Sequence, residues 1–229
     1  MRSAATKTEL ENLLNSRFDA GAGIREHVEP ERFFSGIPEV DGVLGGLARG
    51  ALTEVCGGPS SGRTSFALSL LAGATSRPET CAFVDAADAL DPASAARAGV
   101  DLDRLLWVRC GGCAGRAMQA ADLLVRTGGF GVIVLDIAQI PPRIARHIPL
   151  VSWFRLRRAI ENTPTVLLVV SAEPQAKSAA SVLLEMNRRE AQWSGAPGVS
   201  QLLRGARVQA RPRKPPRPVC AGWEIRALG

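Results

Sequence analysis

The amino-acid sequence predicts an α/β protein with a mainly parallel central sheet and helices on both faces. Short apolar runs alternate with helical stretches from Ala51 to Val170, a pattern typical of strands that are buried on both faces. A glycine-rich loop separates the first of these runs from the first of the helical stretches. The chain has 229 residues, 46% of them apolar, which is enough to bury a core of this kind.

A short helical extension is expected before this core. Thr8 and Glu11 have the spacing of a capping box, and apolar residues follow them at helical spacing. We therefore expect residues 1–35 to form a helix over 8–18 and then a linker. This helix could pack on its own domain or on another subunit.

The core is expected over residues 36–200. Apolar runs predict strands at residues 51–56, 80–84, 105–108, 132–135 and 166–170. Helical stretches between them are predicted from the glycine-rich loop to Leu71 and over residues 92–98, 114–126 and 149–162. Helices in these places join parallel strands by right-handed crossovers.

Residues 201–229 form the third predicted region, a basic, proline-rich segment with a final strand. The stretch from residue 202 to residue 218 contains no acidic residue, and its cations are Arg204, Arg207, Arg211, Arg213, Lys214 and Arg217. Four prolines between Pro212 and Pro218 argue against a central strand or helix there and favour extended chain. The alternating pattern from Trp223 to Leu228 predicts the last strand.

The distribution of charge indicates what the C-terminal third could bind. Residues 1–150 carry 15 Lys and Arg against 17 Asp and Glu, whereas residues 151–229 carry 13 against 5. A basic surface of this kind suits a nucleic acid or an acidic partner protein, and a solvated surface is the alternative. Tyrosine is absent and aromatic residues are 5% of the chain, which leaves few side chains for stacking on bases.

The sequence also indicates a compartment. No uncharged apolar run reaches the length of a membrane span, and the polar N-terminus lacks the apolar core of a signal peptide. We expect a cytoplasmic protein without membrane contact. Five cysteines at irregular spacing are expected to be reduced thiols. Cys110 and Cys113 form one C-x-x-C motif, but no pattern of further zinc ligands accompanies it, so ordinary thiols are expected there too.

The glycine-rich loop has the spacing of a phosphate-binding loop, with Arg63 where that motif has lysine. In such a loop, backbone N–H groups surround a phosphate, the cation reaches its outer oxygens, and the hydroxyl binds Mg²⁺. Arginine is a longer, planar cation and does not replace lysine neutrally, which leaves the binding of ATP and Mg²⁺ open. The predicted nucleotide-binding residues are Gly57, Ser60, Ser61, Gly62, Arg63 and Thr64, with Asp136 as a second partner of Mg²⁺.

Several segments around this loop resemble the RecA family. They are residues 36–55, the run 81–92 with Asp85, Asp88 and Pro92, residues 99–101, the apolar run 132–136 and residues 180–189. The resemblance covers about residues 34–229 and implies a RecA-like phosphate-loop core.

The chain departs from the RecA pattern where that family carries out its chemistry. The position of the catalytic glutamate is Ala87, which cannot orient or deprotonate water. The position of the residues that sense the γ-phosphate is Ser171-Ala172. Both DNA-binding loops are short, the second being cut to residues 173–178, and the RecA C-terminal domain is absent. The resemblance therefore implies a RecA fold that no longer acts as a recombinase.

This profile resembles the ImuA-type proteins, which are SulA-like or RecA-like proteins of bacterial damage-induced mutagenesis, part of the SOS response. The run Trp193-Ser194-Gly195 and the basic tail also look like that family. The resemblance implies an accessory protein of translesion DNA synthesis with no catalytic residue. It implies two partners, an inactive Y-family polymerase homologue of the ImuB type and an error-prone replicative-type polymerase, with RecA or DNA as further candidates. The six cations listed above are the candidate contacts.

Two other functions stay open at this point. The chain could be a divergent DNA-stimulated ATPase of recombinational repair that still uses Arg63 and Asp136. That function needs a base recruited from elsewhere, for which Asp85 and Asp88 are the candidates. The chain could also be a SulA-like inhibitor of cell division, although an intact RecA core argues against that function.

Overall fold

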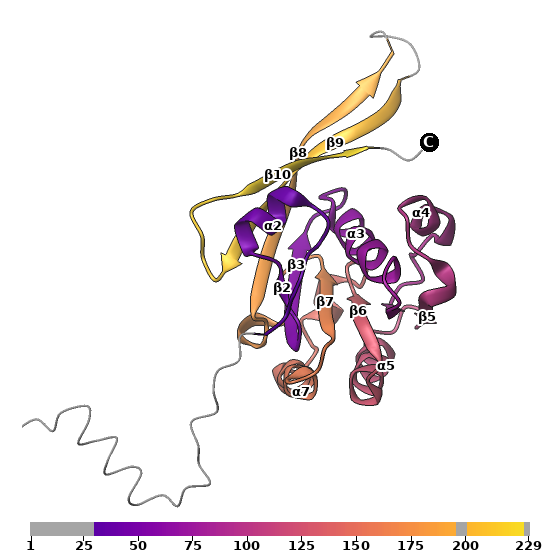
Figure 1. Ribbon diagram of the computed structural model, residues 1–229, viewed down its shortest axis with the longest axis vertical. Helices are drawn as coiled ribbons and strands as arrows, with labels where there is room; N and C mark the ends of the chain where they lie inside the picture. The colour runs from indigo at the N-terminus through magenta and orange to yellow at the C-terminus, as the bar shows by residue number, and fades with distance from the viewer. Residues whose placement is uncertain (1–29, 196–200, 227–229) are drawn as a thin grey trace, which may run out of the picture. The chain divides into compact units, whose positions relative to one another are not determined.

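The computed structural model describes residues 30–195 and 201–226 (Figure 1). The predicted helix over residues 8–18 lies outside these residues. The helices are α2 (Pro38–Leu44), α3 (Arg63–Thr75), α4 (Pro92–Arg97), α5 (Ala114–Thr127), α6 (Pro142–Ala145) and α7 (Leu150–Ile160), with 3-10 turns η1 (Leu102–Arg104) and η2 (Lys177–Ala179). The strands are β1 (Arg32–Phe33), β2 (Leu47–Ala48), β3 (Ala51–Gly57), β4 (Thr80–Asp85), β5 (Leu105–Arg109), β6 (Phe130–Asp136), β7 (Val166–Ser171), β8 (Val182–Ser194), β9 (Leu202–Lys214) and β10 (Ala221–Arg226).

The central sheet has eight strands in the order β10-β9-β8-β3-β7-β6-β4-β5, and β1 pairs with β2 in a small separate sheet. The strands from β8 to β5 pair in parallel, whereas β9 and β10 are antiparallel to their neighbours. The predicted α/β class with a mainly parallel sheet is therefore confirmed. Within residues 30–195 and 201–226, the structure has no helix that is both long enough and apolar enough to cross a membrane.

The parallel strands are buried on both faces, as their unbroken apolar runs predict. Along β6, Val132 and Val134 pack on the face that α3 covers, together with Phe66 and Leu70. Ile133 and Leu135 point to the other face, which α5 and α7 cover with side chains such as Met118, Trp153 and Leu156. Successive residues of a strand alternate between the faces, so an apolar residue at every position gives a three-layer domain.

The C-terminal segment differs from its prediction. The prolines between 212 and 218 were expected to exclude a central strand, but Pro212 lies within β9, and β9 pairs with both β8 and β10. The missing N–H of Pro212 is tolerated because β10 pairs with β9 only as far as Ala210 in the described residues. On the other side, the register of β8 and β9 shifts between Leu183 and Leu184, opposite this proline. Residues 202–226 are thus continuous with the core sheet.

Candidate functional site

The phosphate loop connects β3 to α3 at the carboxyl end of β3, where nucleotide sites of α/β sheets lie. Gly62 precedes the first turn of α3 with φ of 93°, a conformation that favours glycine. A Cβ atom at Gly62 would lie 2.8 Å from Cδ1 of Ile225 and 3.2 Å from Cγ1 of Val208. The loop is therefore packed against β9 and β10, and its backbone N–H groups lie at the start of a helix, where an anion binds.

Arg63 does not occupy the role that lysine has in such loops. Its guanidinium Nη1 donates a hydrogen bond of 2.5 Å to the backbone carbonyl of Ser171, at the end of β7. Burial lowers the pKa of Arg63 from its ordinary value, while the charge of Asp136 opposes that shift. The longer side chain therefore reaches across the loop and is held by the protein's own backbone.

Asp136 lies at the carboxyl end of β6 and is a candidate Mg²⁺ ligand. Its carboxylate accepts a hydrogen bond of 2.8 Å from the backbone N–H of Ala138. Burial raises the pKa of Asp136 to about 6, and the charge of Asp85 adds to this effect. A group with this pKa is mostly ionised at neutral pH and could hold a cation together with the exposed hydroxyl of Thr64.

Some residues at the loop suit a bound phosphate with Mg²⁺, and one does not. The hydroxyl of Ser61 is buried and has no hydrogen-bond partner within the described part of the chain, which suits a ligand oxygen. Thr64 and Asp136 supply oxygen atoms for Mg²⁺. Arg63 fits less well, because its guanidinium is bound to Ser171. The loop therefore keeps candidate groups for a phosphate, whereas the guanidinium of Arg63 is bound to the protein backbone.

Both candidate bases are bound to neighbouring groups of the protein. Asp85 is 1% exposed, and its carboxylate accepts hydrogen bonds from Trp107 Nε1 and from the backbone N–H groups of Ala87, Ala89 and Leu90 at 2.9–3.3 Å. Asp88 forms an ion pair of 3.3 Å with Arg109. The use of Asp85 as a recruited base stays a prediction, and the four donors that already bind its carboxylate count against it. At Ala87 itself the side chain offers no acceptor.

The segment after β7 is held tightly. Glu54 in β3 is fully buried and accepts hydrogen bonds from Ser171 Oγ at 2.8 Å and from the backbone N–H groups of Gln175 and Ala176 at 2.6 and 3.0 Å. Burial raises the pKa of Glu54, and these hydrogen bonds oppose that shift. The short connection between β7 and β8, where the RecA resemblance places a DNA-binding loop, is thus anchored in the core.

The six predicted basic contacts are distributed unevenly over β9 and the turn after it. Arg207 pairs with Glu190 and Glu224 at 3.6 and 3.3 Å, and Arg213 pairs with Glu185 at 3.6 Å. Lys214 donates to the backbone carbonyls of Ser178 and Ala180. These acids lie on neighbouring strands, so the run that is purely basic along the chain is partly neutralised across the sheet. Arg204, Arg211 and Arg217 have no acidic partner among the described residues.

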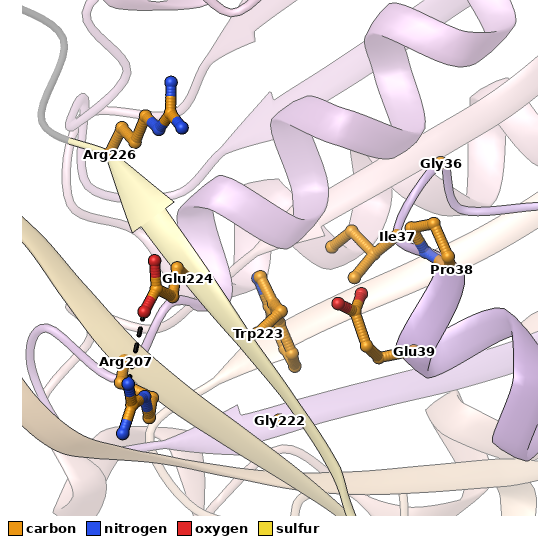
Figure 2. A pocket seen from close by; sticks show the side chains of 9 residues that line it. All are labelled: Gly36, Ile37, Pro38, Glu39, Arg207, Gly222, Trp223, Glu224 and Arg226. Atoms are coloured by element: carbon orange, nitrogen blue, oxygen red, sulfur yellow. Dashed lines mark hydrogen bonds and ion pairs between the residues drawn. The ribbon is translucent and has the colours of Figure 1, made fainter.

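A hollow of about 600 Å³ lies between the start of α2 and β10 (Figure 2). Its wall includes Trp223, and its charged residues are Glu39, Arg207, Glu224 and Arg226. An ion pair joins Arg207 of β9 to Glu224 of β10 on one side of the hollow. The lining contains two acidic and two basic residues, so their charges balance. The hollow includes none of the phosphate-loop residues and offers no surplus charge for an anion.

The outer ribbon contains two of the predicted basic contacts, Arg204 and Arg207, but its exposed apolar side chains were not predicted from the sequence. We use this name for residues 190–194 of β8 and 202–207 of β9, whose far ends extend away from the rest of the sheet (Figure 1). Trp193 and Leu203 face each other across the two strands and are 56% and 39% exposed, and Leu202 is 60% exposed. Arg204 adds a charge beside them. The sequence shows the apolar residues Trp193 and Leu203 on either side of Gly195, but it does not show that they are exposed.

Together, the parallel sheet, the loop between β3 and α3 and the aspartate at the end of β6 define a phosphate-loop protein of the α/β class. The RecA N-terminal domain family matches residues 20–145, more than half of the chain, and the chain belongs to this family.

Sequence relatives agree with this assignment, and a solved structure shares the fold. The chain is 39% identical to Protein RecA of Rickettsia massiliae over 124 residues, which are 53% of this chain and 36% of that protein. It is 46% identical to Protein RecA of Rhodospirillum centenum over 101 residues, which are 44% of this chain and 28% of that protein. The matches thus span about a third of these relatives. The crystal structure of the RadB recombinase has the same fold, with a TM-score of 0.64 and 18% identity over 84% of this chain and 96% of that chain.

Proposed function

We propose that the protein is a RecA-family accessory protein that binds partner proteins in mutagenic translesion DNA synthesis and does not hydrolyse ATP. The observation that carries this proposal is the state of the candidate catalytic centre. Ala87 stands where the family resemblance requires a carboxylate, and Asp85, one of the two candidate substitutes, already accepts four hydrogen bonds. Without a group that orients and deprotonates water, phosphoryl transfer to water loses its general base.

In this proposal the phosphate loop has a structural role. Its N–H groups and Ser61 can hold a phosphate, and Arg63 links the loop to the end of β7. A nucleotide bound there would stabilise the folded state by mass action without being consumed.

The outer ribbon supports the binding of a partner protein. Trp193 and Leu203, which pair across the two strands, are exposed on one face of the ribbon, and the exposed Leu202 next to Leu203 points to the other face. Tryptophan and arginine, here Trp193 and Arg204, are the residue types enriched in binding hot spots. The partners are an inactive Y-family polymerase homologue and, in the same assembly, an error-prone replicative-type polymerase, as the ImuA-type resemblance of this region implies. Arg211 and Arg217 offer further contacts to an acidic protein surface, to RecA or to DNA.

The proposal is tested by co-expression with the inactive Y-family polymerase homologue of the same genome, followed by size-exclusion chromatography and titration calorimetry. We expect a stable complex, and we expect the double variant Trp193→Ser, Leu203→Ser to weaken it at least about tenfold. The matched control is Leu123→Ser, because Leu123 is 66% exposed on α5 and lies outside the ribbon. The absence of a complex, or an equal loss in the control, would contradict the proposal.

A divergent DNA-stimulated ATPase is the second candidate. It is favoured by the unpartnered Ser61 hydroxyl and by Asp136, which together suit a phosphate with Mg²⁺. ATP turnover distinguishes the two functions.

A further inference from the structure

The C-x-x-C motif forms a tight turn directly after β5. Gly111 and Gly112 have φ of 59° and 77°, and these two successive left-handed residues give the geometry of a type I′ turn, which glycine adopts readily. The backbone N–H of Cys113 donates to the carbonyl of Cys110 at 3.3 Å and closes the turn. The first and last Cα atoms of a β-turn lie within about 7 Å, close to the range that a disulfide bridges.

This turn is fixed to the neighbouring strand. The N–H of Cys110 donates to the carbonyl of Asp85 at 2.9 Å, and the N–H of Gly112 donates to the carbonyl of Ala86 at 2.8 Å. Both acceptors belong to the end of β4 and the residue after it. The two cysteines are therefore held next to each other at the carboxyl edge of the sheet, beside the segment that contains Ala87.

The environments of the two thiols differ. Cys113 is half-buried and occupies the position before the first turn of α5, a helix of 14 residues. The backbone N–H of Arg116 lowers the pKa of the Cys113 thiol, and the charge of Arg116 adds to this effect. Cys110 is 3% exposed, and burial raises the pKa of its thiol, with a further contribution from the charge of Asp85. Cys113 is thus the better nucleophile near neutral pH.

We propose that Cys110 and Cys113 are a peroxide-sensitive pair that closes a reversible disulfide across this turn. The Cys113 thiolate attacks one oxygen of a hydroperoxide, the O–O bond breaks, and the products are the Cys113 sulfenic acid and, after protonation, water or an alcohol. The Cys110 sulfur then attacks the sulfenic sulfur, the S–O bond breaks, and a second water molecule leaves with the thiol proton. Two thiols are oxidised by two electrons and one hydroperoxide is reduced.

Two observations favour oxidation over metal binding at this motif. Within residues 30–195 and 201–226, no group of three or more His, Cys, Asp and Glu side chains is arranged to hold a metal ion. A structural zinc site needs four protein ligands, and this turn supplies two. Because Cys113 is partly exposed, an oxidant in solution can reach one thiol of the pair.

The first test uses the unmodified full chain. The reduced protein is labelled with limiting iodoacetamide at pH 7, and each cysteine is quantified by peptide mass spectrometry. We expect Cys113 to react at least about threefold faster than Cys220, which is also half-buried but has no second cysteine in its turn. Equal rates, or a faster Cys220, would overturn the proposed role of Cys113.

The second test follows the disulfide. One equivalent of hydrogen peroxide should lower the free thiols of the denatured protein from the five of the sequence to three, with a loss of two hydrogen masses and full reversal by dithiothreitol. Cys110→Ser should accumulate a Cys113 sulfenic acid that dimedone traps, Cys113→Ser should lose the fast reaction, and Cys220→Ser should behave as the parent. A Cys113 sulfenic acid that persists in the unmodified protein, or a disulfide to another cysteine, would overturn the pairing.

Discussion

The parallel strands and the antiparallel outer ribbon of the same sheet use their polar and apolar groups in opposite ways. At the carboxyl edge of the parallel strands, Asp85 accepts four hydrogen bonds, Glu54 accepts three, and Arg63 is bound to Ser171. On the outer ribbon, Trp193 and Leu202 are more than half exposed. These charged side chains at the candidate site are bound by the protein itself, whereas the ribbon leaves apolar side chains exposed.

Asp85→Ala should give the largest change, because the side chain organises the segment after β4. The variant leaves the indole N–H of Trp107 and three backbone N–H groups without their acceptor. We expect a loss of about 3–5 kcal/mol in the free energy of unfolding, measured by urea denaturation. Asp88→Asn, which removes one exposed ion pair and keeps a residue type that tolerates the φ of 57° at this position, should cost less than about 1 kcal/mol. An equal loss of unfolding free energy in both variants would show that the hydrogen bonds of Asp85 do not organise the segment after β4.

Asp136→Asn should give a smaller effect that depends on pH. Burial raises the pKa of Asp136 from 3.8 to about 6, so the folded state binds this proton more tightly than the unfolded chain. The resulting stabilisation is present below pH 4 and is lost as the pH rises through 6. After allowance for partial solvation, we expect the variant to be about 1 kcal/mol more stable than the parent at pH 8 and equal to it at pH 4. Thermal unfolding between pH 4 and pH 8 measures this difference, and a variant that is less stable at pH 8 contradicts it.

The double variant Trp193→Ser, Leu203→Ser should have the smallest effect on stability. Because both side chains are largely exposed, we expect the free energy of unfolding to change by less than about 0.5 kcal/mol, while partner binding falls. Chemical denaturation of the isolated protein checks the first part. A large loss of stability would mean that the side chains of Trp193 and Leu203 pack on the domain. The outer ribbon would then not differ from the parallel strands as described above.

The sequence predicts the parallel half of the fold well because each of its strands is apolar at nearly every position. The runs at 132–135 and 166–170 and the helices between the strands are in place. The antiparallel half is harder to predict because of Pro212 in β9. This proline is tolerated because β10 pairs with β9 only as far as Ala210, and because the register between β8 and β9 shifts opposite it. Such compensation depends on neighbouring strands and leaves no trace in the local sequence.

The sequence predicts which residues make up the candidate site, but not the contacts that their side chains form. The spacing from Gly57 to Thr64 identified the loop, and Asp136 was recognised from the strand before it. The capture of Arg63 by the carbonyl of Ser171, 108 residues later, could not be predicted because it depends on how β3 and β7 lie side by side. The same holds for Arg207 and Arg213, whose acidic partners lie on other strands.

ATP hydrolysis by the purified protein is the most direct test of the central claim that this phosphate loop does not support catalysis. Turnover is measured with Mg²⁺, with and without single-stranded DNA, for the parent chain and for Arg63→Ala as the baseline. We predict that the parent shows no turnover above this baseline under either condition. Clear DNA-stimulated turnover in the parent that Arg63→Ala abolishes would contradict the account and establish the protein as a divergent ATPase.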